Sequence, residues 1–265
     1  MDLSSTRRVP FGWAVAAGAV LAAGGLLLFG LFVLGGPGGR PAPATPAGET
    51  ASPGAAGPSP AAVTTVATVV RAVPRYARPG QRGHGTVPAS WRGRPSVLPV
   101  IATRPGWVRV RLAQRPNGST AWLPDSDVRF GTTPYRIVID LAATRLKLYK
   151  QGHLILSAPA GVGAGDDPTP PGEYFTAFDE APASPGYGPF IMVTSAHSPA
   201  LADWSGSGDA IIGIHGPLGD DARIGTSGAR VSHGCVRLHL ATLARLADVP
   251  PGTPIDIISK GVPGA

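Results

Sequence analysis

The chain has 265 residues, among them 37 Gly, 30 Pro and a single Cys, and a formal net charge of +7 at pH 7. Gly and Pro make up about a quarter of it, at the edge of low-complexity composition, so part of the chain is expected to lie outside any core. The charge suits an acidic polymer, a phosphate-rich surface or an anionic membrane, or it reflects arginines scattered over the surface. Nucleic acid is not an expected partner, because the sequence carries no zinc-ligand spacing, helix-turn-helix pattern or aromatic ribonucleoprotein motif.

An apolar segment without charged residues runs from Phe11 to Leu34. As a helix it would measure about 36 Å, enough to cross a hydrocarbon core of ~30 Å. Arg7 and Arg8 precede it, so the positive-inside rule places residues 1–10 in the cytoplasm as a short tail. We therefore expect a single-pass anchor in the cell membrane over residues 11–34, with the rest of the chain outside the cytoplasm. A cleaved signal peptide, which would release a secreted protein, is the alternative.

Residues 35–62 are mostly Gly, Pro, Ala, Ser and Thr, a composition that cannot bury enough apolar surface to offset its ordering entropy. They are expected to form a disordered tether. Strand-like runs follow at 63–70, 98–101, 107–112 and 120–123, with a turn signal at 116–118. This pattern predicts a small β-barrel over residues 63–130 and resembles bacterial SH3-like modules. Its tryptophans, Trp91, Trp107 and Trp122, are interpreted as core, with a ligand groove as the alternative.

Residues 134–260 carry the strongest strand pattern in the chain. Strands are expected at 135–141, 145–149, 153–157, 190–193, 210–214 and 255–258, with a hairpin turn at Gln151-Gly152. One helix is expected at His239–Asp248, presenting Leu240, Leu243, Ala244 and Ala247 on one face and stopped by Pro250-Pro251. The predicted class is mainly β, with one short helix in this second domain.

The chemistry-bearing residues gather around the only cysteine, in Ser232-His233-Gly234-Cys235-Val236-Arg237, with Ile214-His215-Gly216 before them. A lone cysteine in an exported protein cannot form an intramolecular disulfide. It is then an intermolecular bridge, a small buried hydrophobe or a reactive thiol. The neighbouring imidazoles favour a nucleophile with a proton acceptor.

A free thiol is only a few per cent ionised at pH 7, with a pKa of ~8.5, so catalysis needs a base beside it. His215 and His233 are the candidates. Gly234 allows a close backbone approach to substrate, and the amides of Gly234 and Cys235 are candidate oxyanion donors. Arg237 is a candidate clamp for a substrate carboxylate, with a plain surface charge as the alternative.

A zinc site built from His215, His233, Cys235 and His239 is an alternative, but the paired ligand spacing of standard sites is missing. We expect no metal and no cofactor, and a structural role for His239. His84, His153 and His197 are lone histidines in turn-like or hairpin contexts and receive no role.

His215, sixteen intervening residues and then Ser232-His233-Gly234-Cys235-Val236 closely resemble the signature of L,D-transpeptidases. The resemblance covers residues 135–259 and includes the turn Thr169-Pro170-Pro171-Gly172. It implies an L,D-transpeptidase-type β-sandwich. Many members carry Asn two residues after the cysteine, where this chain has Arg237, which leaves the details of substrate recognition open.

The resemblance also implies roles for single residues. Cys235 would be the nucleophile and His215 the general base, oriented by the carbonyl of Gly216. Ser232 and His233 would shape the site, and the Gly234 and Cys235 amides would face the oxyanion. A loop over residues 186–208, with Tyr187, Phe190 and Trp204, is a candidate lid.

The implied reaction acts on peptidoglycan stem peptides. Cys235 would attack the third residue of a tetrapeptide stem, release D-Ala and pass the acyl group to a second stem in a 3→3 cross-link. Carbapenem-type β-lactams would acylate the same thiol. Two alternatives stay open: an L,D-carboxypeptidase with water as acceptor, and a non-catalytic wall-binding protein in which Cys235 is inert.

Overall fold

The computed structural model describes residues 61–204, 206–226 and 228–259, all within one compact unit. The expected cytoplasmic tail, the anchor at 11–34 and nearly all of the tether at 35–62 lie outside this part. Within the described residues, no helix has the length and apolar character needed to cross a membrane.

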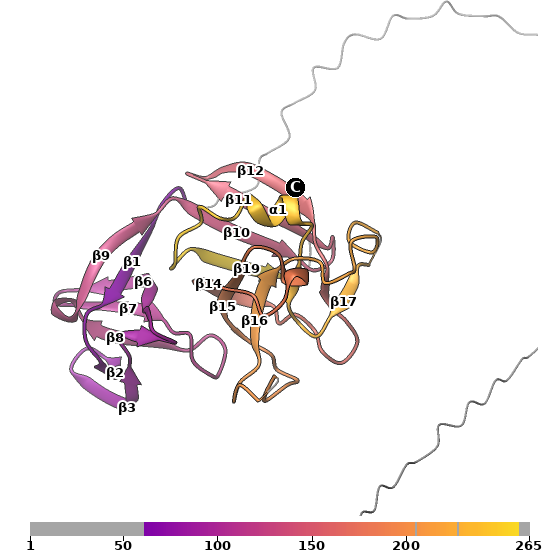
Figure 1. Cartoon of the computed structure of the whole chain (residues 1–265). Helices are drawn as coiled ribbons and strands as arrows, with labels where there is room; N and C mark the ends of the chain where they lie inside the picture. The colour runs from indigo at the N-terminus through magenta and orange to yellow at the C-terminus, as the bar shows by residue number, and fades with distance from the viewer. Residues whose placement is uncertain (1–60, 205, 227, 260–265) are drawn as a thin grey trace, which may run out of the picture. The chain divides into compact units, whose positions relative to one another are not determined.

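The first part of the fold, residues 64–133, is here called the N-terminal module, and its strands appear in indigo to magenta in Figure 1. Its nine strands are β1 (Thr64–Val69), β2 (Val73–Arg78), β3 (Gln81–Val87), β4 (Ser90–Trp91), β5 (Arg94–Pro95), β6 (Val97–Arg104), β7 (Trp107–Arg111), β8 (Thr120–Pro124) and β9 (Val128–Thr133). Seven form one sheet in the order β3-β2-β8-β7-β6-β1-β9, and β4 and β5 form a separate hairpin. The resemblance to SH3-like modules stays a prediction.

Alternation of side chains explains this sheet. In β7, Val108 and Val110 are buried while Arg109 between them is exposed, as expected when successive residues point to opposite faces. The predicted turn before β8 forms, with the Ser119 N–H donating to the Pro116 carbonyl at 3.2 Å. Trp122 is buried, and half-buried Trp91 packs edge-on against Phe178, with ring centroids 5.4 Å apart.

The second part has ten strands and one α-helix. They are β10 (Tyr135–Asp140), β11 (Arg145–Lys150), β12 (His153–Pro159), β13 (Val162–Gly163), β14 (Gly172–Glu180), β15 (Ile191–His197), β16 (Ile211–His215), β17 (Arg230–Ser232), β18 (Val236–Arg237), α1 (Leu240–Ala244) and β19 (Pro254–Ile258). Eight strands form a mixed sheet, β12-β11-β10-β19-β14-β15-β16-β18, and β13 pairs with β17. The prediction of a mainly β protein is confirmed.

Local sequence chemistry sets the connections in this sheet. Gln151 and Gly152 both adopt positive φ, 52° and 79°, as a type I′ turn requires, and they join β11 to β12. The last strand, β19, enters between β10 and β14, parallel to the first and antiparallel to the second. The apolar side chains of this region form one continuous buried cluster that contains Ile137, Leu146, Met192, Ile214 and Ile255.

The expected helix at His239–Asp248 is wrong in length and in its buried face. The α-helix covers only Leu240–Ala244, because the chain then tightens into turns with bonds of the i→i−3 type, such as Leu246 N–H to Leu243 carbonyl. Because residues three apart now lie on the same side of the chain, in place of the 3.6-residue period of an α-helix, Leu243, Leu246 and Val249 are buried. Leu240 is instead 49% exposed.

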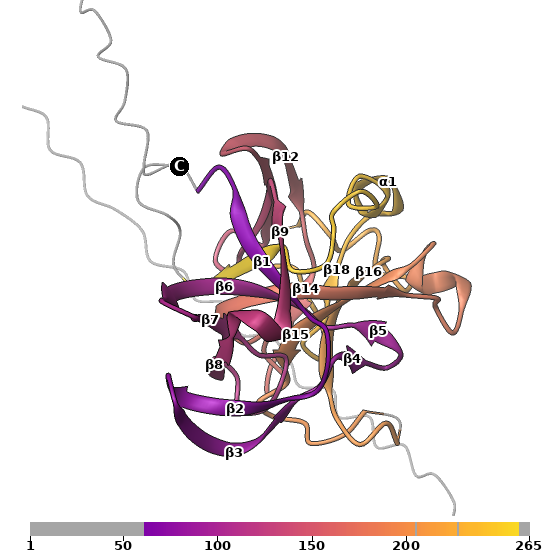
Figure 2. The same ribbon diagram turned by 90° about the vertical axis from the view of Figure 1, so that its left-hand side faces the viewer.

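Phe175 links the two parts of the fold. It lies on β14 of the second sheet, yet it belongs to the buried cluster of the N-terminal module with residues such as Leu98 and Leu112. Strand β6 contacts β14, and the two lie close together in Figure 2. The core of the module is therefore closed by a residue from outside it.

Candidate active site

A cavity of about 350 Å³ contains most of the predicted site. Five predicted residues line it: His215, Ser232, His233, Cys235 and Arg237. Gly216 and Gly234 do not line the cavity. Their carbonyl groups instead accept hydrogen bonds from His215 and Thr169, respectively. We call this space the Cys235 cavity.

Two adjacent parallel strands bring the thiol and the imidazole together. Strand β16 ends at His215, and β18 begins at Val236, which pairs with Ile214. Both paired side chains are fully buried in the apolar cluster, and this burial fixes the register. Cys235 therefore lies beside Gly213, whose N–H donates to the Cys235 sulfur at 3.4 Å.

His215 is buried, with 2% of its surface exposed, and its Nδ1 lies 2.8 Å from the Gly216 carbonyl oxygen. Because a carbonyl only accepts, Nδ1 carries the proton and Nε2 is left as a proton acceptor. Burial, with a smaller contribution from the Arg237 charge, lowers the pKa of His215 to about 4 against the opposing effect of the Gly216 hydrogen bond. The imidazole is thus neutral at pH 7 and able to act as a base.

The Cys235 thiol is partly exposed to the cavity. Burial of the sulfur raises the pKa of Cys235 above its ordinary value, while the hydrogen bond from the Gly213 N–H and the Arg237 charge lower it. The resting thiol is therefore protonated at neutral pH. Attack on a carbonyl then requires a base that removes the proton during the reaction.

Hydrogen bonds hold the backbone that carries Cys235. Ser232 Oγ donates to the Cys235 carbonyl at 2.5 Å and accepts from the Gly234 N–H at 3.2 Å. The Gly234 carbonyl accepts from Thr169 Oγ1 at 2.7 Å, and Thr169 accepts from the Gly163 N–H at 2.8 Å. Because the Gly234 N–H is used inside the loop, the expectation that it faces an oxyanion is not supported by this geometry.

At two positions of the site a side chain larger than that of glycine would collide with neighbouring atoms. Gly234 has φ of +113°, and a Cβ on it would lie 2.7 Å from Ile212 Cδ1. A Cβ on Gly216 would lie 2.8 Å from the Tyr187 carbonyl, which accepts the Gly216 N–H at 2.7 Å. The same Tyr187 packs its ring edge-on against His215, with centroids 4.7 Å apart. Gly216 therefore fixes the imidazole both directly and through Tyr187.

Arg237 is largely buried at the cavity, with 14% of its side chain exposed, and it forms an ion pair with Asp220. Its buried Nε has no hydrogen-bond partner among the described residues. The sequence carried no signal for Asp220 as a partner, because it comes from the loop between β16 and β17. Thr169 was noticed only as part of a turn, and its bonds to the cysteine loop were not expected.

The remaining histidines differ in their surroundings. His233 is exposed, close to the Trp204 ring at 5.4 Å, and its Nε2 lies 4.0 Å from Asp167. His239 does not line the cavity. Its Nδ1 lies 3.2 Å from Asp221 Oδ1. No group of three or more His, Cys, Asp or Glu in the described part of the chain is arranged to hold a metal ion.

The candidate lid is not one loop. Strand β15 runs through residues 186–208, so the region divides into a short stretch before Ile191 and a longer one after His197. Tyr187 and Trp204 line the cavity from these two stretches. Phe190 instead packs against the main core.

Comparison with known proteins gives the family. The model of the L,D-transpeptidase catalytic domain matches residues 134–257. A candidate L,D-transpeptidase, YkuD of Bacillus licheniformis, is 35% identical over 127 residues, which cover 48% of this chain and 67% of that protein. The chain belongs to the L,D-transpeptidase family.

Solved structures of L,D-transpeptidases are also similar to this chain, at lower sequence identity. One from Mycobacterium smegmatis is 19% identical, with a TM-score of 0.37, over 61% of this chain and 82% of that one. LdtMt1 in complex with imipenem is 17% identical, with a TM-score of 0.37, over 74% and 82%.

Proposed function

We propose that the protein is a cysteine acyltransferase that forms 3→3 cross-links between peptidoglycan stem peptides. The observation that carries this proposal is that the Cys235 thiol and the buried His215 imidazole line one cavity, with the imidazole held by the Gly216 carbonyl. Membership of the L,D-transpeptidase family supports the substrate class.

In the proposed first step, His215 Nε2 takes the Cys235 proton as the sulfur attacks the carbonyl carbon of the third stem residue. The Cys235 N–H stabilises the oxyanion, a contribution of about 2.7–4 kcal/mol for one such donor. The C–N bond to D-Ala then breaks, and the imidazolium returns its proton to the leaving amine. A thioester on Cys235 remains.

In the second step, an amine from another stem attacks the thioester carbonyl, and His215 accepts the proton that this amine loses. As the C–S bond breaks, His215 returns the proton to the leaving sulfur. The thiol is regenerated and an amide cross-link is formed. Arg237, beside the thiol, is proposed to attract a stem carboxylate. Carbapenem-type β-lactams are expected to acylate the same sulfur.

We also propose that the enzyme works on the cell-wall side of the membrane, where its substrate lies. The apolar segment at residues 11–34 would serve as the anchor, or as a signal that is removed. The N-terminal module, proposed as SH3-like, and the tether before it would then lie between the membrane and the catalytic region.

The test is to incubate the full chain and its Cys235→Ala variant with a muropeptide that carries a diamino-acid-containing tetrapeptide stem, and to read the products by mass spectrometry. A dimer that has lost one D-Ala, absent with Cys235→Ala, is the expected result. Tripeptide without dimer would indicate an L,D-carboxypeptidase. Unchanged substrate with a folded protein would contradict the enzyme proposal and favour a wall-binding protein.

A further inference from the structure

One wall of the Cys235 cavity is the connection between β15 and β16, residues 198–204 and 206–210, here called the wall segment. Ser198, Trp204, Ser207, Asp209 and Ala210 of this segment line the cavity. The segment forms no helix or strand. Its internal hydrogen bonds, such as that from the Ser198 N–H to the Ala210 carbonyl at 2.7 Å, close it into a loop but do not attach it to the N-terminal module.

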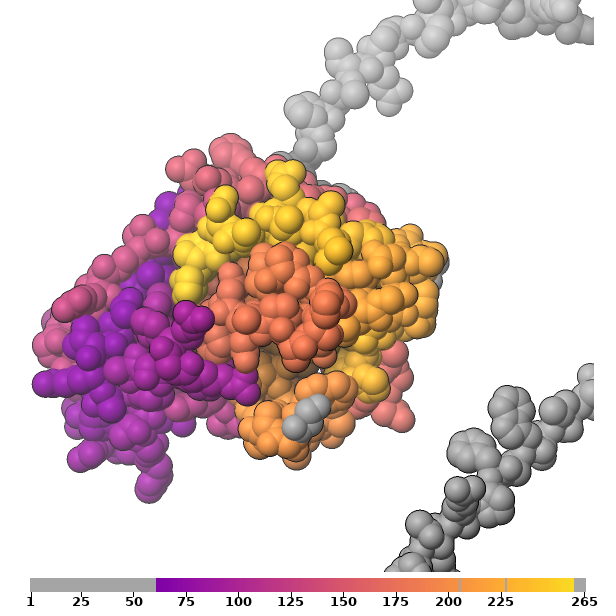
Figure 3. Space-filling model, in the orientation of Figure 1, coloured from indigo at the N-terminus to yellow at the C-terminus, as the bar shows by residue number. Residues whose placement is uncertain are grey.

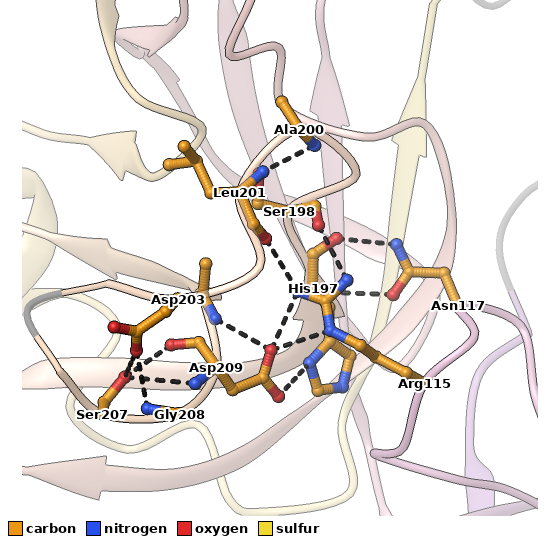
Figure 4. A network of polar contacts seen from close by, with 11 residues as sticks. Arg115, Asn117, His197, Ser198, Ala200, Leu201, Asp203, Ser207, Gly208 and Asp209 are labelled. Carbon is orange, nitrogen blue, oxygen red and sulfur yellow. Dashed lines mark hydrogen bonds and ion pairs between the residues drawn. The ribbon is translucent and has the colours of Figure 1, made fainter.

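The N-terminal module supplies contacts that position this segment. Arg115, in the loop between β7 and β8, donates through Nε to Asp209 Oδ1 at 2.9 Å. The same guanidinium donates to the carbonyls of Ser198 and Leu201, at 2.9 and 3.0 Å (Figure 4). One side chain thus holds both ends of the wall segment and its first turn.

Asn117 of the same loop pairs with the strand end from which the wall segment starts. Its Nδ2 donates to the His197 carbonyl at 2.8 Å, and its Oδ1 accepts from the His197 N–H at 2.9 Å (Figure 4). The amide therefore satisfies both backbone groups of His197, as a neighbouring strand would. The buried His197 ring in turn lies 2.7 Å from Asp209 Oδ2.

Asp209 joins these contacts because it accepts a hydrogen bond from Arg115 and lies against the His197 ring. Burial raises its pKa, but the Arg115 hydrogen bond, the neighbouring His197 and the Arg115 charge outweigh burial and hold the pKa of Asp209 below its ordinary value. Asp209 is thus charged at neutral pH, and its pair with Arg115 is charge-assisted. Burial lowers the pKa of His197, so this imidazole is uncharged at neutral pH.

A second loop of the N-terminal module also reaches the cavity. Arg92, between β4 and β5, belongs to the cavity lining, and its Nη1 lies 3.0 Å from Glu180 Oε2. The neighbouring Trp91 packs on Phe178. The space-filling view shows magenta atoms of the module directly against orange atoms of the later region (Figure 3).

We propose that the N-terminal module is part of the substrate site, with Arg115 and Asn117 as positioning residues that hold the wall segment against the Cys235 cavity. The substrate part of this proposal rests on the proposed acyltransferase function. The positioning part rests only on the contacts described above.

The test compares full chains carrying Arg115→Ala, Arg115→Lys or Asn117→Ala with a control, Arg78→Ala. Arg78 is an exposed arginine at the end of β2 in the same module, and its side chain has no hydrogen bond or ion pair among the described residues. Two quantities are measured: amide hydrogen exchange of the wall segment, and kcat and KM for the cross-linking of tetrapeptide stems.

In Arg115→Ala, exchange in the wall segment is expected to rise by about tenfold or more, because three hydrogen bonds are lost at once. KM is expected to rise more than kcat falls, since the thiol and the imidazole keep their contacts. Asn117→Ala should act in the same direction. Arg115→Lys should recover part of the effect, because one ammonium can pair with Asp209 but cannot reach both carbonyls. Arg78→Ala should match the parent chain.

Three results would overturn the proposal. Unchanged exchange in the wall segment of Arg115→Ala would remove the positioning role. Increased exchange across the whole of residues 64–133 would show unfolding of the module rather than release of one segment. Faster exchange with unchanged KM would separate the segment from the substrate. If the parent chain itself makes no cross-links, the acyltransferase function fails, while the exchange data still decide the positioning role.

Discussion

At the scale of single residues, the electrostatics of the site place His215 and Cys235 in their uncharged forms. Burial lowers the pKa of His215 to about 4 and raises the pKa of Cys235. Both shifts have the same origin, because a charged group loses its hydration when protein atoms surround it. A resting thiolate–imidazolium pair is therefore disfavoured, and the proposed attack would require transfer of the thiol proton to the imidazole.

The acidic limb of the activity profile tests this arrangement. Protonated His215 cannot accept the thiol proton, so kcat/KM is expected to fall as pH decreases through about 4 rather than through the ordinary histidine value of about 6.5. The measurement is the initial rate of dimer formation at low substrate between about pH 3 and pH 8. An acidic midpoint near 6.5 would contradict a buried, neutral His215.

Arg237 lowers the pKa of both reacting groups, so Arg237→Gln should raise both. The pH dependence of Cys235 alkylation by iodoacetamide is then expected to shift to higher pH, and the acidic limb of activity should shift upward as well. Arg223→Gln is the matched control, because Arg223 pairs with the same Asp220 but is 60% exposed. Equal shifts in both variants would assign the effect to Asp220 instead.

Sequence reasoning found the residues of the site that belong to one spaced motif. It placed Cys235 and His215 together because a strand end and a returning loop carry them, and both line one cavity. It missed Asp220 and the bonds of Thr169, since these depend on contacts between segments distant in the chain. The sequence around Asp220, in a Gly- and Asp-rich loop, does not indicate that this carboxylate pairs with Arg237.

At the scale of elements, the loop before β18 depends on a side chain from another segment. Thr169 is 2% exposed and bridges the Gly163 N–H and the Gly234 carbonyl. Thr169→Val keeps the shape of the side chain but leaves two buried backbone groups without partners, which costs about 1–3 kcal/mol each.

For Thr169→Val we therefore expect a lower free energy of unfolding and a slower reaction of Cys235, measured by urea denaturation and by alkylation. Thr169→Ser keeps the hydroxyl and should retain most of both properties. A Thr169→Val chain with unchanged alkylation would show that the cysteine loop holds its geometry without this bridge.

Elements with strong local patterns were predicted well from the sequence. Alternating or continuous apolar runs gave the main strands, and Gln151-Gly152 gave the hairpin between β11 and β12. Two-residue strands such as β13 and β18 are too short to show any periodicity. The helix after His239 was overestimated because its apolar residues also fit a spacing of three, which the structure adopts after Ala244.

At the scale of the whole described region, the two parts do not have independent cores. The strand patterns predicted a small β-barrel over residues 63–130 and a second β domain over 134–260, each with its own core. Phe175, 1% exposed, instead completes the first cluster from a strand of the second sheet. Nothing in the local sequence around Phe175 distinguishes it from Tyr174, which lies in the other cluster.

Phe175→Ala should therefore destabilise both parts together, by about 3–5 kcal/mol as for other buried phenylalanines. We expect one cooperative unfolding transition at lower denaturant, with tryptophan fluorescence and circular dichroism coinciding. Phe130→Ala is the control, since Phe130 is 55% exposed and its loss should change little. Two separate transitions in the parent chain would contradict a shared core.

The junction formed by Arg115 and Asn117 also has a consequence for inhibition. The wall segment contacts the module and lines the cavity. If the proposed positioning role holds, occupancy of the cavity and the contacts of the module with this segment would be linked, and each would strengthen the other by the same factor. A bound β-lactam would protect the module from proteolysis. By reciprocity, a substitution at Arg115 would weaken the inhibitor, so resistance can arise at a position that never touches the drug.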